Sequence, residues 1–401
     1  MIYLDHNATT QPAPEVLDEM HDALERAWAN PSSTHAPGQA ARRLLADARV
    51  RVAQFLGCQG AELVFTSGAT EANHMAVTGA LALGRQAGES DGLPGRPPRH
   101  RLVLSAVEHP ALLALAARLA DQGVPVDLLP VDACGRLDLA RARALITPDV
   151  ALVSVMGANN ETGVLMPIAE LAALAHAAGA LLHMDATQLP GKSRWRFADS
   201  GADLASVSAH KLHGPKGVGA LIVRKGLALP ALLAGRQERN RRGGTENMPG
   251  IAGFAAACDR TARSLADDLA HMTALRQRLE DGLRAALPGV VVYGDQAHRL
   301  PNTSCLRFGA LDSEQVLGKL ERAGVVASSG AACTASGTQP SHVLLAMGES
   351  AQHAKASVRF SLGRETTSAD VQRAIDAARR AIGPLLAPAA TTAFPARFMA
   401  A

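Results

Sequence analysis

A lysine between an apolar run and a glycine-rich turn is the first residue of this sequence with a clear chemical use. Lys211 lies in the segment SAHKLHGPKGVG, residues 208–219. In a partly desolvated pocket the neutral form of lysine is favoured, and a neutral amine can form a Schiff base with an aldehyde. Most lysines are solvated surface residues, so this motif alone does not decide between the two interpretations.

A carboxylate precedes this lysine at the end of another apolar run. The segment ALLHMDATQ, residues 180–188, is expected to form a strand with Asp185 at its carboxyl end. Open α/β sheets bind ligands at that end of their strands. An Asp there can keep a pyridine nitrogen protonated, which turns the ring into an electron sink, although a strand-end Asp also commonly caps a helix.

A third segment, LVFTSGATEA at residues 63–72, is typical of a strand, a tight turn and the start of a helix. The unpaired N–H groups of a helix N-terminus favour a phosphate, here at Ala69 and Thr70. The segment lacks the spacing of a nucleotide P-loop and of a dinucleotide-binding fold. A phosphate site, a partner for a pyridine nitrogen and a Schiff-base lysine together indicate pyridoxal 5'-phosphate as the cofactor.

One of the five cysteines lies in a run of small residues, ASSGAACTASG, residues 327–337. Such a run has little side chain to bury, so we expect a mobile loop that carries the thiol of Cys333. An odd number of cysteines, with no C-x-x-C pair and no metal-ligand spacing, favours a reducing compartment. The other four are expected to be small buried side chains: Cys58, Cys134, Cys258 and Cys305.

The elements that must position these groups alternate between strands and helices. Between residues 60 and 225, runs rich in Val, Leu and Ile alternate with segments of helical period, which predicts a mostly parallel sheet. The continuous apolar character of the runs indicates burial on both faces of that sheet. The predicted strands are Leu63–Thr66, Arg101–Ser105, Val126–Leu129, Ala151–Met156, Ala180–Met184, Leu204–Ser206 and Gly219–Val223.

A different pattern begins near residue 262 and predicts a second, smaller α/β layer. From Leu265 to Leu283 apolar residues recur every three or four positions, which is typical of an amphipathic helix, and Pro288 and Gly289 end it. The stretch Gly84–His100 is rich in Gly and Pro and is expected to be a surface insertion. The later predicted elements are strands near Val290–Tyr293, Ser304–Phe308 and Ser357–Leu362 and helices near Ser313–Ala323 and Ser368–Ile382.

Composition excludes some classes of function. The 401 residues carry 40 basic and 37 acidic side chains, with no basic stripe, so nucleic acid is not an expected partner. With 47% apolar residues the chain can bury a large core without disulfides or metals. The start, MIYLDHNATT, has no signal-peptide features, and no apolar run is long enough to cross a membrane. We therefore expect a cytoplasmic protein with a small substrate.

The chain resembles the cysteine desulfurases of the nitrogen-fixation and iron–sulfur-assembly type, within the class V aminotransferase superfamily. The resemblance runs from residue 2 to about residue 383 and is carried by ordered blocks: YLDHNATT, NPSSTHAPGQAAR, VFTSGATEANH, VEHPA, GANNETG, HMDATQ, SAHKLHGPKGVG, RRGGTEN, SSGAACT, PSHVLLAMG and VRFSLGR. It implies the pyridoxal-phosphate-dependent transferase fold type I, an α/β fold with a mostly parallel seven-stranded sheet and a smaller C-terminal α/β domain. The expected division is an N-terminal segment that packs with the small domain (1–14), a large cofactor-binding domain (15–261), a small domain with the cysteine loop (262–386) and a frayed tail (387–401).

The resemblance also implies roles for individual residues. Lys211 is implied as the lysine that binds the cofactor, His109 as the residue that stacks on its ring and assists proton transfer, and Asp185 as the partner of the ring nitrogen. The other implied groups are Gln188 and Asn160 near the phenolic oxygen, Ala69, Thr70, Ser208 and His210 at the phosphate together with Thr245 of the partner subunit, and Arg359 with Asn160 at the substrate carboxylate.

The implied reaction converts L-cysteine to L-alanine, and Cys333 takes the sulfur as a persulfide. An acceptor such as an iron–sulfur scaffold protein then receives the sulfur, and Cys333 is implied as a shared iron–sulfur ligand during that transfer. The SSGxxCT form of its segment resembles the members with an exposed, mobile loop. A homodimer is implied by the position of Thr245 in the block RRGGTEN.

Two alternatives stay open. A selenocysteine or cystine lyase, or a class V aminotransferase, would need Lys211 and Asp185 but no thiol at residue 333, and a cofactor-binding regulator would need only the fold. The sequence does not say whether the sulfur serves nitrogenase, general cluster assembly or RNA thiolation. It also departs from the family pattern at Ala234 and Arg236, which stand where the family usually has glycines.

Overall fold

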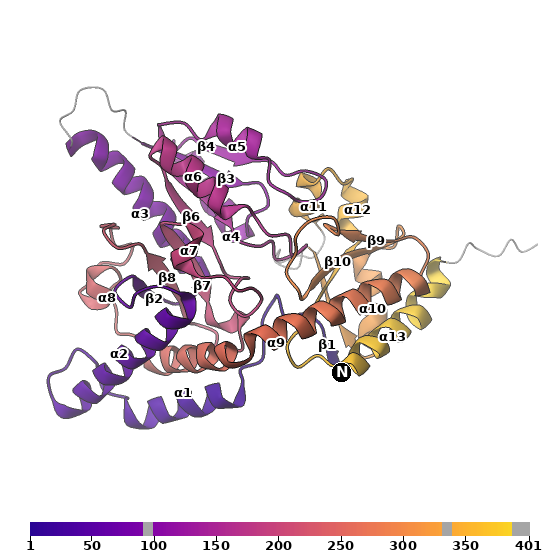
Figure 1. Ribbon diagram of the computed structural model, residues 1–401, viewed down its shortest axis with the longest axis horizontal. Coiled ribbons are helices and arrows are strands. Elements are labelled where there is room, and N and C mark those ends of the chain that lie inside the picture. Colours follow the sequence, from indigo (N-terminus) through magenta and orange to yellow (C-terminus); the bar gives the residue numbers. More distant parts are fainter. Residues whose placement is uncertain (91–98, 331–338, 387–401) are drawn as a thin grey trace, which may run out of the picture.

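Two layers lie side by side in the structure, a computed structural model that describes residues 1–90, 99–330 and 339–386 (Figure 1). The larger layer holds a seven-stranded sheet and the smaller one a four-stranded sheet. The long helix α9 (Met248–Ala286) extends from one layer to the other (Figure 1). The predicted α/β fold with a mostly parallel seven-stranded sheet is confirmed.

The larger sheet has the strand order β2-β8-β7-β6-β5-β3-β4. β8 runs antiparallel to both of its neighbours, and the other neighbouring strands are parallel. Every predicted strand is present, with end shifts of one or two residues in β5, β6 and β7. The bounds are β2 (Leu63–Thr66), β3 (Arg101–Ser105), β4 (Val126–Leu129), β5 (Val150–Met156), β6 (Leu181–Asp185), β7 (Leu204–Ser208) and β8 (Gly219–Val223).

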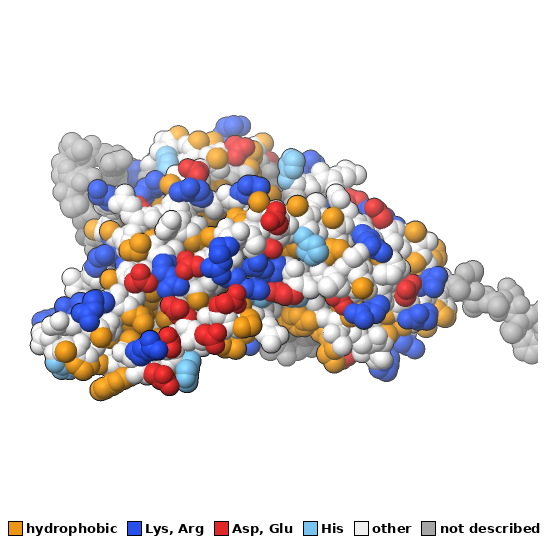
Figure 2. Space-filling model, turned by 60° about the horizontal axis from the view of Figure 1, so that its bottom comes forward, with side chains coloured by type: hydrophobic (Ala, Val, Ile, Leu, Met, Phe, Trp, Pro, Cys, Tyr) orange, Lys and Arg blue, Asp and Glu red, His pale blue; other side chains and the backbone are white. Residues whose placement is uncertain are grey.

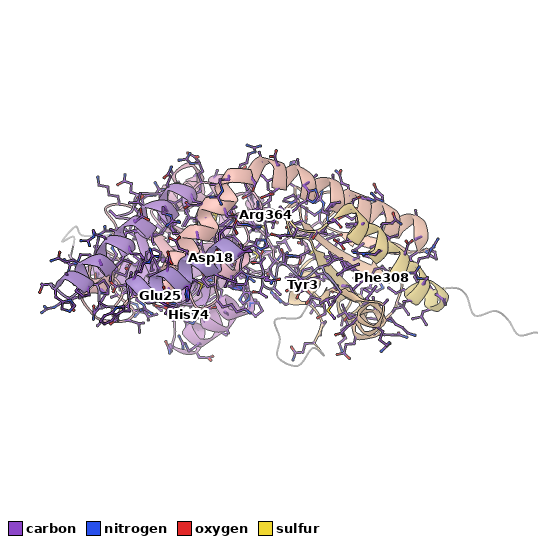
Figure 3. The ribbon with its side chains drawn as sticks, turned by 90° about the horizontal axis from the view of Figure 1, so that it is seen from below. Tyr3, Asp18, Glu25, His74, Phe308 and Arg364 are labelled. Atoms are coloured by element: carbon purple, nitrogen blue, oxygen red, sulfur yellow. The ribbon has the colours of Figure 1, made fainter. Side chains whose placement is uncertain are left out.

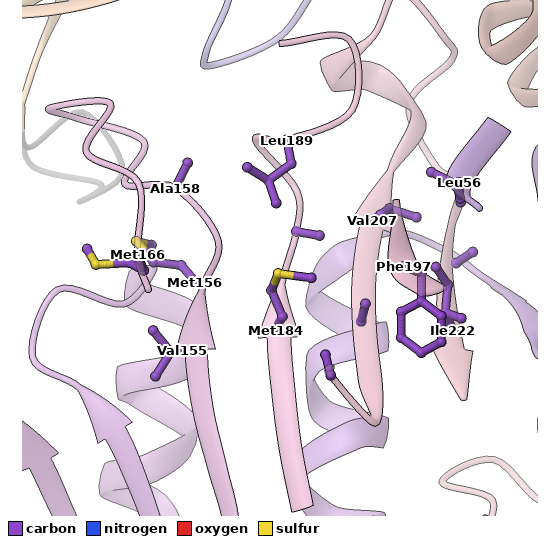
Figure 4. Close-up of a cluster of buried hydrophobic side chains, with 14 of the residues drawn as sticks. Leu56, Val155, Met156, Ala158, Met166, Met184, Leu189, Phe197, Val207 and Ile222 are labelled. Atoms are coloured by element: carbon purple, nitrogen blue, oxygen red, sulfur yellow. The ribbon is translucent and has the colours of Figure 1, made fainter. Parts of the chain in front are cut away.

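Helices cover both faces of this sheet. α3 (Ala69–Ser90) and α4 (Pro110–Asp121) pack on one face, where their apolar side chains join those of the strands in one buried cluster. α2 (Ala36–Leu56), α6 (Ile168–Ala178) and the first turns of α9 contribute to the cluster on the other face, part of which Figure 4 shows. The remaining elements of this layer are α1 (Pro14–Arg26), α5 (Leu139–Leu145), α7 (Phe197–Ser200), the 3₁₀ turn η1 (Ala209–Lys211) and α8 (Gln237–Asn240).

The smaller layer is an antiparallel sheet of order β12-β13-β10-β9 with its own apolar core. The end of α9 and helix α13 pack against it, which explains the amphipathic pattern of both helices. Its elements are β9 (Val290–Tyr293), β10 (Thr303–Phe308), α10 (Ser313–Arg322), β12 (Ser328–Ser329), α11 (His342–Ala346), α12 (Ala351–Lys355), β13 (Ser357–Ser361) and α13 (Ser368–Leu386).

The N-terminal residues pair with this smaller layer rather than with the large sheet that follows them in sequence. β1 (Ile2–Tyr3) lies parallel to β11 (Val325–Val326), and Asp5 forms a further bridge with Ser361. Figure 3 places Tyr3 on the same side of the molecule as Phe308 of β10. Residues 5–10 therefore pass between the two layers, beside the carboxyl ends of the large sheet.

Helix α9 differs from its sequence prediction, because it begins at Met248 rather than near residue 262. Residues 250–258 are all buried, including Ile251 and Phe254, so this part of the helix has no polar face and no amphipathic period. The expected boundary at residue 262 falls inside this continuous helix. The division into domains therefore stays a prediction.

The stretch expected to be a surface insertion begins as a helix. α3 continues to Ser90, and Gly84 lies within it rather than in a loop. A Cβ on Gly84 would lie 2.4 Å from the backbone oxygen of Arg99, so the glycine lets the returning chain pack directly on the helix. Residues 91–98 and the tail from residue 387 lie outside the described residues. No helix in the described part of the chain is long and apolar enough to span a membrane.

Candidate active site

A cavity of about 490 Å³ opens at the carboxyl ends of β2, β3, β5, β6 and β7. This is the edge at which open α/β sheets bind ligands. The expected residues that line it are Ala69, Thr70, His109, Asn160, Asp185, Gln188, Ser208, His210, Lys211 and Arg359. A second cavity of about 510 Å³, beside Arg51 and Trp195, is lined by none of them.

Lys211 ends the 3₁₀ turn that follows β7, so the buried strand delivers it to the cavity. Its side chain is half-buried, and its Nζ donates to the backbone oxygens of Asn7 and Ala8 at 2.6 and 2.7 Å. Both acceptors belong to the N-terminal segment. The lysine is therefore held at the cavity by residues that lie far from it in sequence.

Asp185 is the last residue of β6 and is buried. One carboxylate oxygen accepts from Asn73 Nδ2 at 2.8 Å, and the other accepts from the backbone N–H of Thr187 at 3.0 Å. A carboxylate offers about four acceptor sites, so Asp185 has capacity left for a donor in the cavity. The carboxylate thus fits a ligand that carries an N–H group.

His109 caps helix α4, and its Nδ1 accepts from the backbone N–H of Ala111 at 3.2 Å. Burial lowers its pKa below the usual histidine value; Asp185 opposes this shift, and Lys211 adds to it. An imidazole that is neutral and accepts at Nδ1 carries its proton on Nε2. The side chain is therefore able to donate a hydrogen bond from Nε2.

Glu108, immediately before this histidine, is fully buried. Its Oε1 accepts from Ser105 Oγ at 2.5 Å and from the backbone N–H of Met156 at 2.7 Å, while Oε2 has no partner in the described chain. Burial raises the pKa of this carboxyl to about 8. It follows that Glu108 is largely protonated at neutral pH.

The turn between β2 and α3 fits a phosphate. α3 begins at Ala69, so the N–H groups of its first turn, including that of Thr70, have no acceptor within the helix. Ser208 and His210 face the same cavity. Burial lowers the pKa of His210 to about 4, so its ring is neutral, and its Nδ1 lies 3.1 Å from Thr9 Oγ1.

Arg359 of β13 enters the cavity from the smaller layer and is 1% exposed. It forms an ion pair with Asp5 at 2.6 Å and donates to the backbone oxygen of Asn160 at 3.2 Å. Its Nε is buried and has no hydrogen-bond partner among the described residues. The guanidinium therefore has a donor to offer to a carboxylate in the cavity.

Two residues that the sequence did not single out complete the site. Asn7 and Lys192 are buried, and both contact Gln188: Gln188 Nε2 donates to the backbone oxygen of Asn7 at 3.1 Å, and Lys192 Nζ to Gln188 Oε1 at 2.5 Å. Asn7 belongs to the block YLDHNATT, which gives a signal that the segment matters. Lys192 has no such signal, because only burial between elements distinguishes it from a surface lysine.

Thr245 is exposed and does not line this cavity. Cys333 lies outside the described residues, so the structure leaves the predictions on it unchanged. Of the other cysteines, Cys258 and Cys305 are buried as expected, whereas Cys58 and Cys134 are only half-buried, which corrects the expectation for these two. No cluster of three or more metal-binding side chains occurs in the described ranges.

Taken together, the sheet and its cavity define an α/β enzyme that presents a lysine, a carboxylate and an arginine to one small ligand site. The aminotransferase class-V family matches residues 2–374, which shows that the chain belongs to this family. Acidic and basic side chains are interspersed on the face shown in Figure 2.

Known relatives agree with this assignment. The chain is 46% identical over 378 residues to a cysteine desulfurase of Cereibacter sphaeroides, and the alignment covers 94% of each chain. Among solved structures, a NifS-like protein superposes with a TM-score of 0.86 at 32% identity, covering 95% of this chain and 99% of the other. SspA in complex with cysteine superposes with a TM-score of 0.78 at 29% identity, covering 92% of this chain and all (100%) of that one.

Proposed function

We propose that this chain is a pyridoxal-phosphate-dependent cysteine desulfurase that converts L-cysteine to L-alanine and transfers the sulfur to Cys333. The observation that carries the proposal is the convergence of Lys211, Asp185 and Arg359 on one cavity at the strand ends. The similarity to a cysteine desulfurase over nearly the whole chain, and to a solved structure with bound cysteine, supports the substrate.

The residues present fit the cofactor. Lys211 is the candidate for its covalent attachment, Asp185 has a free acceptor site for the ring N–H, and the first turn of α3 with Ser208 and His210 suits the phosphate. His109 and Gln188 line the same space. When bound, pyridoxal phosphate supplies a ring that withdraws electrons from the substrate α-carbon.

The chain's own groups then bind the substrate and move its protons. The buried Nε of Arg359 receives the substrate carboxylate, next to the ion pair with Asp5. Two carbonyls of the N-terminal segment hold the Lys211 amine at the cavity. From there the amine takes the proton from the substrate α-carbon and later returns a proton to the substrate. His109 holds a proton at Nε2 that it can donate.

Cys333 is the proposed sulfur acceptor. Its thiolate attacks the sulfur of the substrate, a new S–S bond forms and the Cβ–S bond breaks, and the electron pair stays on the substrate, which takes up protons to become alanine. The resulting persulfide is transferred to an acceptor such as an iron–sulfur scaffold protein. Cys58, by contrast, is half-buried and its pKa is raised to about 12 by burial, so it is a poor nucleophile.

The deciding experiment is the variant Cys333→Ser, with Cys58→Ser as its control. The Cys333 variant should still bind the cofactor and change its absorption on addition of L-cysteine, because those steps need Lys211, Asp185 and Arg359. Its alanine production should stop, and mass spectrometry should find added sulfur on the Cys333 peptide of the wild type. Alanine production at the wild-type rate would instead favour a selenocysteine or cystine lyase, because such an enzyme needs no thiol at this position.

We also propose a homodimer, in which Thr245 contacts the cofactor phosphate of the partner subunit. Thr245 is exposed in this chain and lies away from its own cavity. Leu17 and Leu24 are 53% and 59% exposed, and their spacing of seven residues places them on one face of α1; Trp28, just beyond the helix, is 74% exposed. Large exposed apolar side chains on one face are typical of a surface that a second copy covers.

A further inference from the structure

Lys192 is a buried lysine outside the main cavity. It is 5% exposed and lies on the segment after β6, where it lines a small cavity behind Lys211 rather than the large one. Its Nζ contacts Gln188 Oε1 at 2.5 Å and Asn7 Oδ1 at 3.1 Å. Both of these acceptors are uncharged amide oxygens. A buried lysine held only by amide oxygens is unusual enough to ask what it does.

The contacts of Lys192 fix the orientation of the side-chain amides of Gln188 and Asn7. Because the amine donates to Gln188 Oε1, the Nε2 group must point the other way, and it donates to the backbone oxygen of Asn7 at 3.1 Å. The Asn7 side chain is fixed in the same manner: Oδ1 accepts from Lys192 and from Asn302 Nδ2, and Nδ2 donates to Thr303 Oγ1 at 2.8 Å.

The number of partners fits an uncharged amine. A neutral amine has two N–H groups, and Lys192 has two acceptors, both uncharged. Burial lowers its pKa well below the usual lysine value, and the nearby cations Lys211 and Arg359 lower it further. These two contacts let Lys192 hold both amides at once.

We propose that Lys192 is a positioning residue that makes Gln188 a hydrogen-bond donor toward the cavity and holds Asn7, whose backbone oxygen binds Lys211. Gln188 Nε2 carries a second N–H group, and Gln188 lines the cavity, whereas Lys192 does not. The wall at Gln188 therefore selects a ligand that presents an acceptor oxygen, such as a deprotonated phenolic oxygen. This inference rests on the proposed function.

The test uses Lys192→Met in the full-length protein, with Lys225→Met as a control because Lys225 is exposed and far from the cavity. Without the amine, Gln188 is free to turn, so we expect pyridoxal phosphate to bind at least about tenfold more weakly and its visible absorption band to shift. Combining Lys192→Met with Gln188→Ala should give a loss of affinity well below the product of the two single losses.

A second variant keeps the test decisive even if Lys192→Met does not fold. Gln188→Glu retains an acceptor for Lys192 but removes the N–H group from the cavity wall, so it should also weaken cofactor binding at least about tenfold and shift the band. Wild-type affinity and spectrum in either variant, or independent effects in the double variant, would overturn the inference. A wild-type protein that binds no pyridoxal phosphate would instead reject the proposed function itself.

Discussion

Lys211 is held by two backbone carbonyls, so its side chain is already directed to the cavity without a ligand. We expect Lys211→Ala to lose the borohydride-reducible link to pyridoxal phosphate completely. The matched control is Lys216→Ala, because Lys216 also lines the cavity but lies on the glycine-rich turn. Peptide mapping of the reduced wild type should find the cofactor on Lys211 and not on Lys192. A reducible link that survives in Lys211→Ala would show that Lys211 is not the lysine that binds the cofactor.

Glu108 should give the protein a measurable pH dependence. Its pKa is raised from 4.5 to about 8 by burial, so between these pH values the folded state binds a proton that the unfolded state has lost. The free energy of unfolding should therefore fall as pH rises through this window, by up to about 1.4 kcal/mol per pH unit.

Glu108→Gln imitates the protonated acid and keeps the acceptor for Ser105 and Met156. The comparison is urea unfolding of both proteins at several pH values. In the variant, the free energy of unfolding should no longer fall with pH on account of this group. The variant should therefore become more stable relative to the wild type between pH 5 and about 8. Parallel curves for the two proteins would show that Glu108 does not titrate in this window.

Single residues were predictable from sequence where a local motif surrounds them. Asp185 ends a buried strand and Lys211 follows one, so their places along the chain favoured this site, whereas Arg359 was expected there through the resemblance carried by the block VRFSLGR. The contribution of Asn7 and Lys192 arises from contacts between segments that are distant in sequence. Composition and periodicity contain no information on such contacts.

At the scale of elements, the loop before α9 is anchored by a buried ion pair. Glu238 accepts from both terminal nitrogens of Arg49 in α2 and from the backbone N–H of Phe65 in β2. Glu238, Arg239 and Asn240 all have positive φ angles, a conformation that side chains other than glycine adopt at a cost. The ion pair thus stabilises a strained turn beside β2.

We expect Arg49→Met to lower the free energy of unfolding by about 3–5 kcal/mol, because it leaves the carboxylate of Glu238 buried and unpaired. The same substitution at Arg373 is the control, since its pair with Asp370 in α13 is exposed and should contribute under about 1 kcal/mol. Chemical denaturation measures both. Equal losses of stability in the two variants would mean that burial does not determine how much each ion pair contributes.

Strands were predictable from the sequence where several successive residues are apolar on one face or on both faces. All strands of the large sheet were found in this way. The start of α9 was not, because its buried first turns lack a polar face. Gly84 was expected to begin a surface insertion, but it is a close-contact position inside α3. β1, β11 and β12 have only two residues each, too few for any period.

At the scale of the whole molecule, the proposed dimer has two measurable consequences. Sedimentation should give twice the chain mass of 41.6 kDa, and Trp28→Glu should shift the protein toward the monomer, because Trp28 is 74% exposed in the single chain. Thr245→Val should weaken cofactor binding without changing the mass. A fully active monomer, or unchanged affinity in Thr245→Val, would contradict the dimer proposal.

The place of residues 2–10 also determines when during synthesis the enzyme can form. These residues leave the ribosome long before their partners, because Ile2 pairs with Val325, and Asp5 with Arg359. At roughly 5–20 residues per second, their partners follow only after tens of seconds. A nascent chain arrested before residue 325 can already build the large sheet and the contacts of Asn7 with Gln188 and Lys192, but the segment that holds Lys211 still lacks its pairing with β11 and the ion pair of Asp5 with Arg359. Binding of pyridoxal phosphate should therefore be weak until the chain has been made to Arg359.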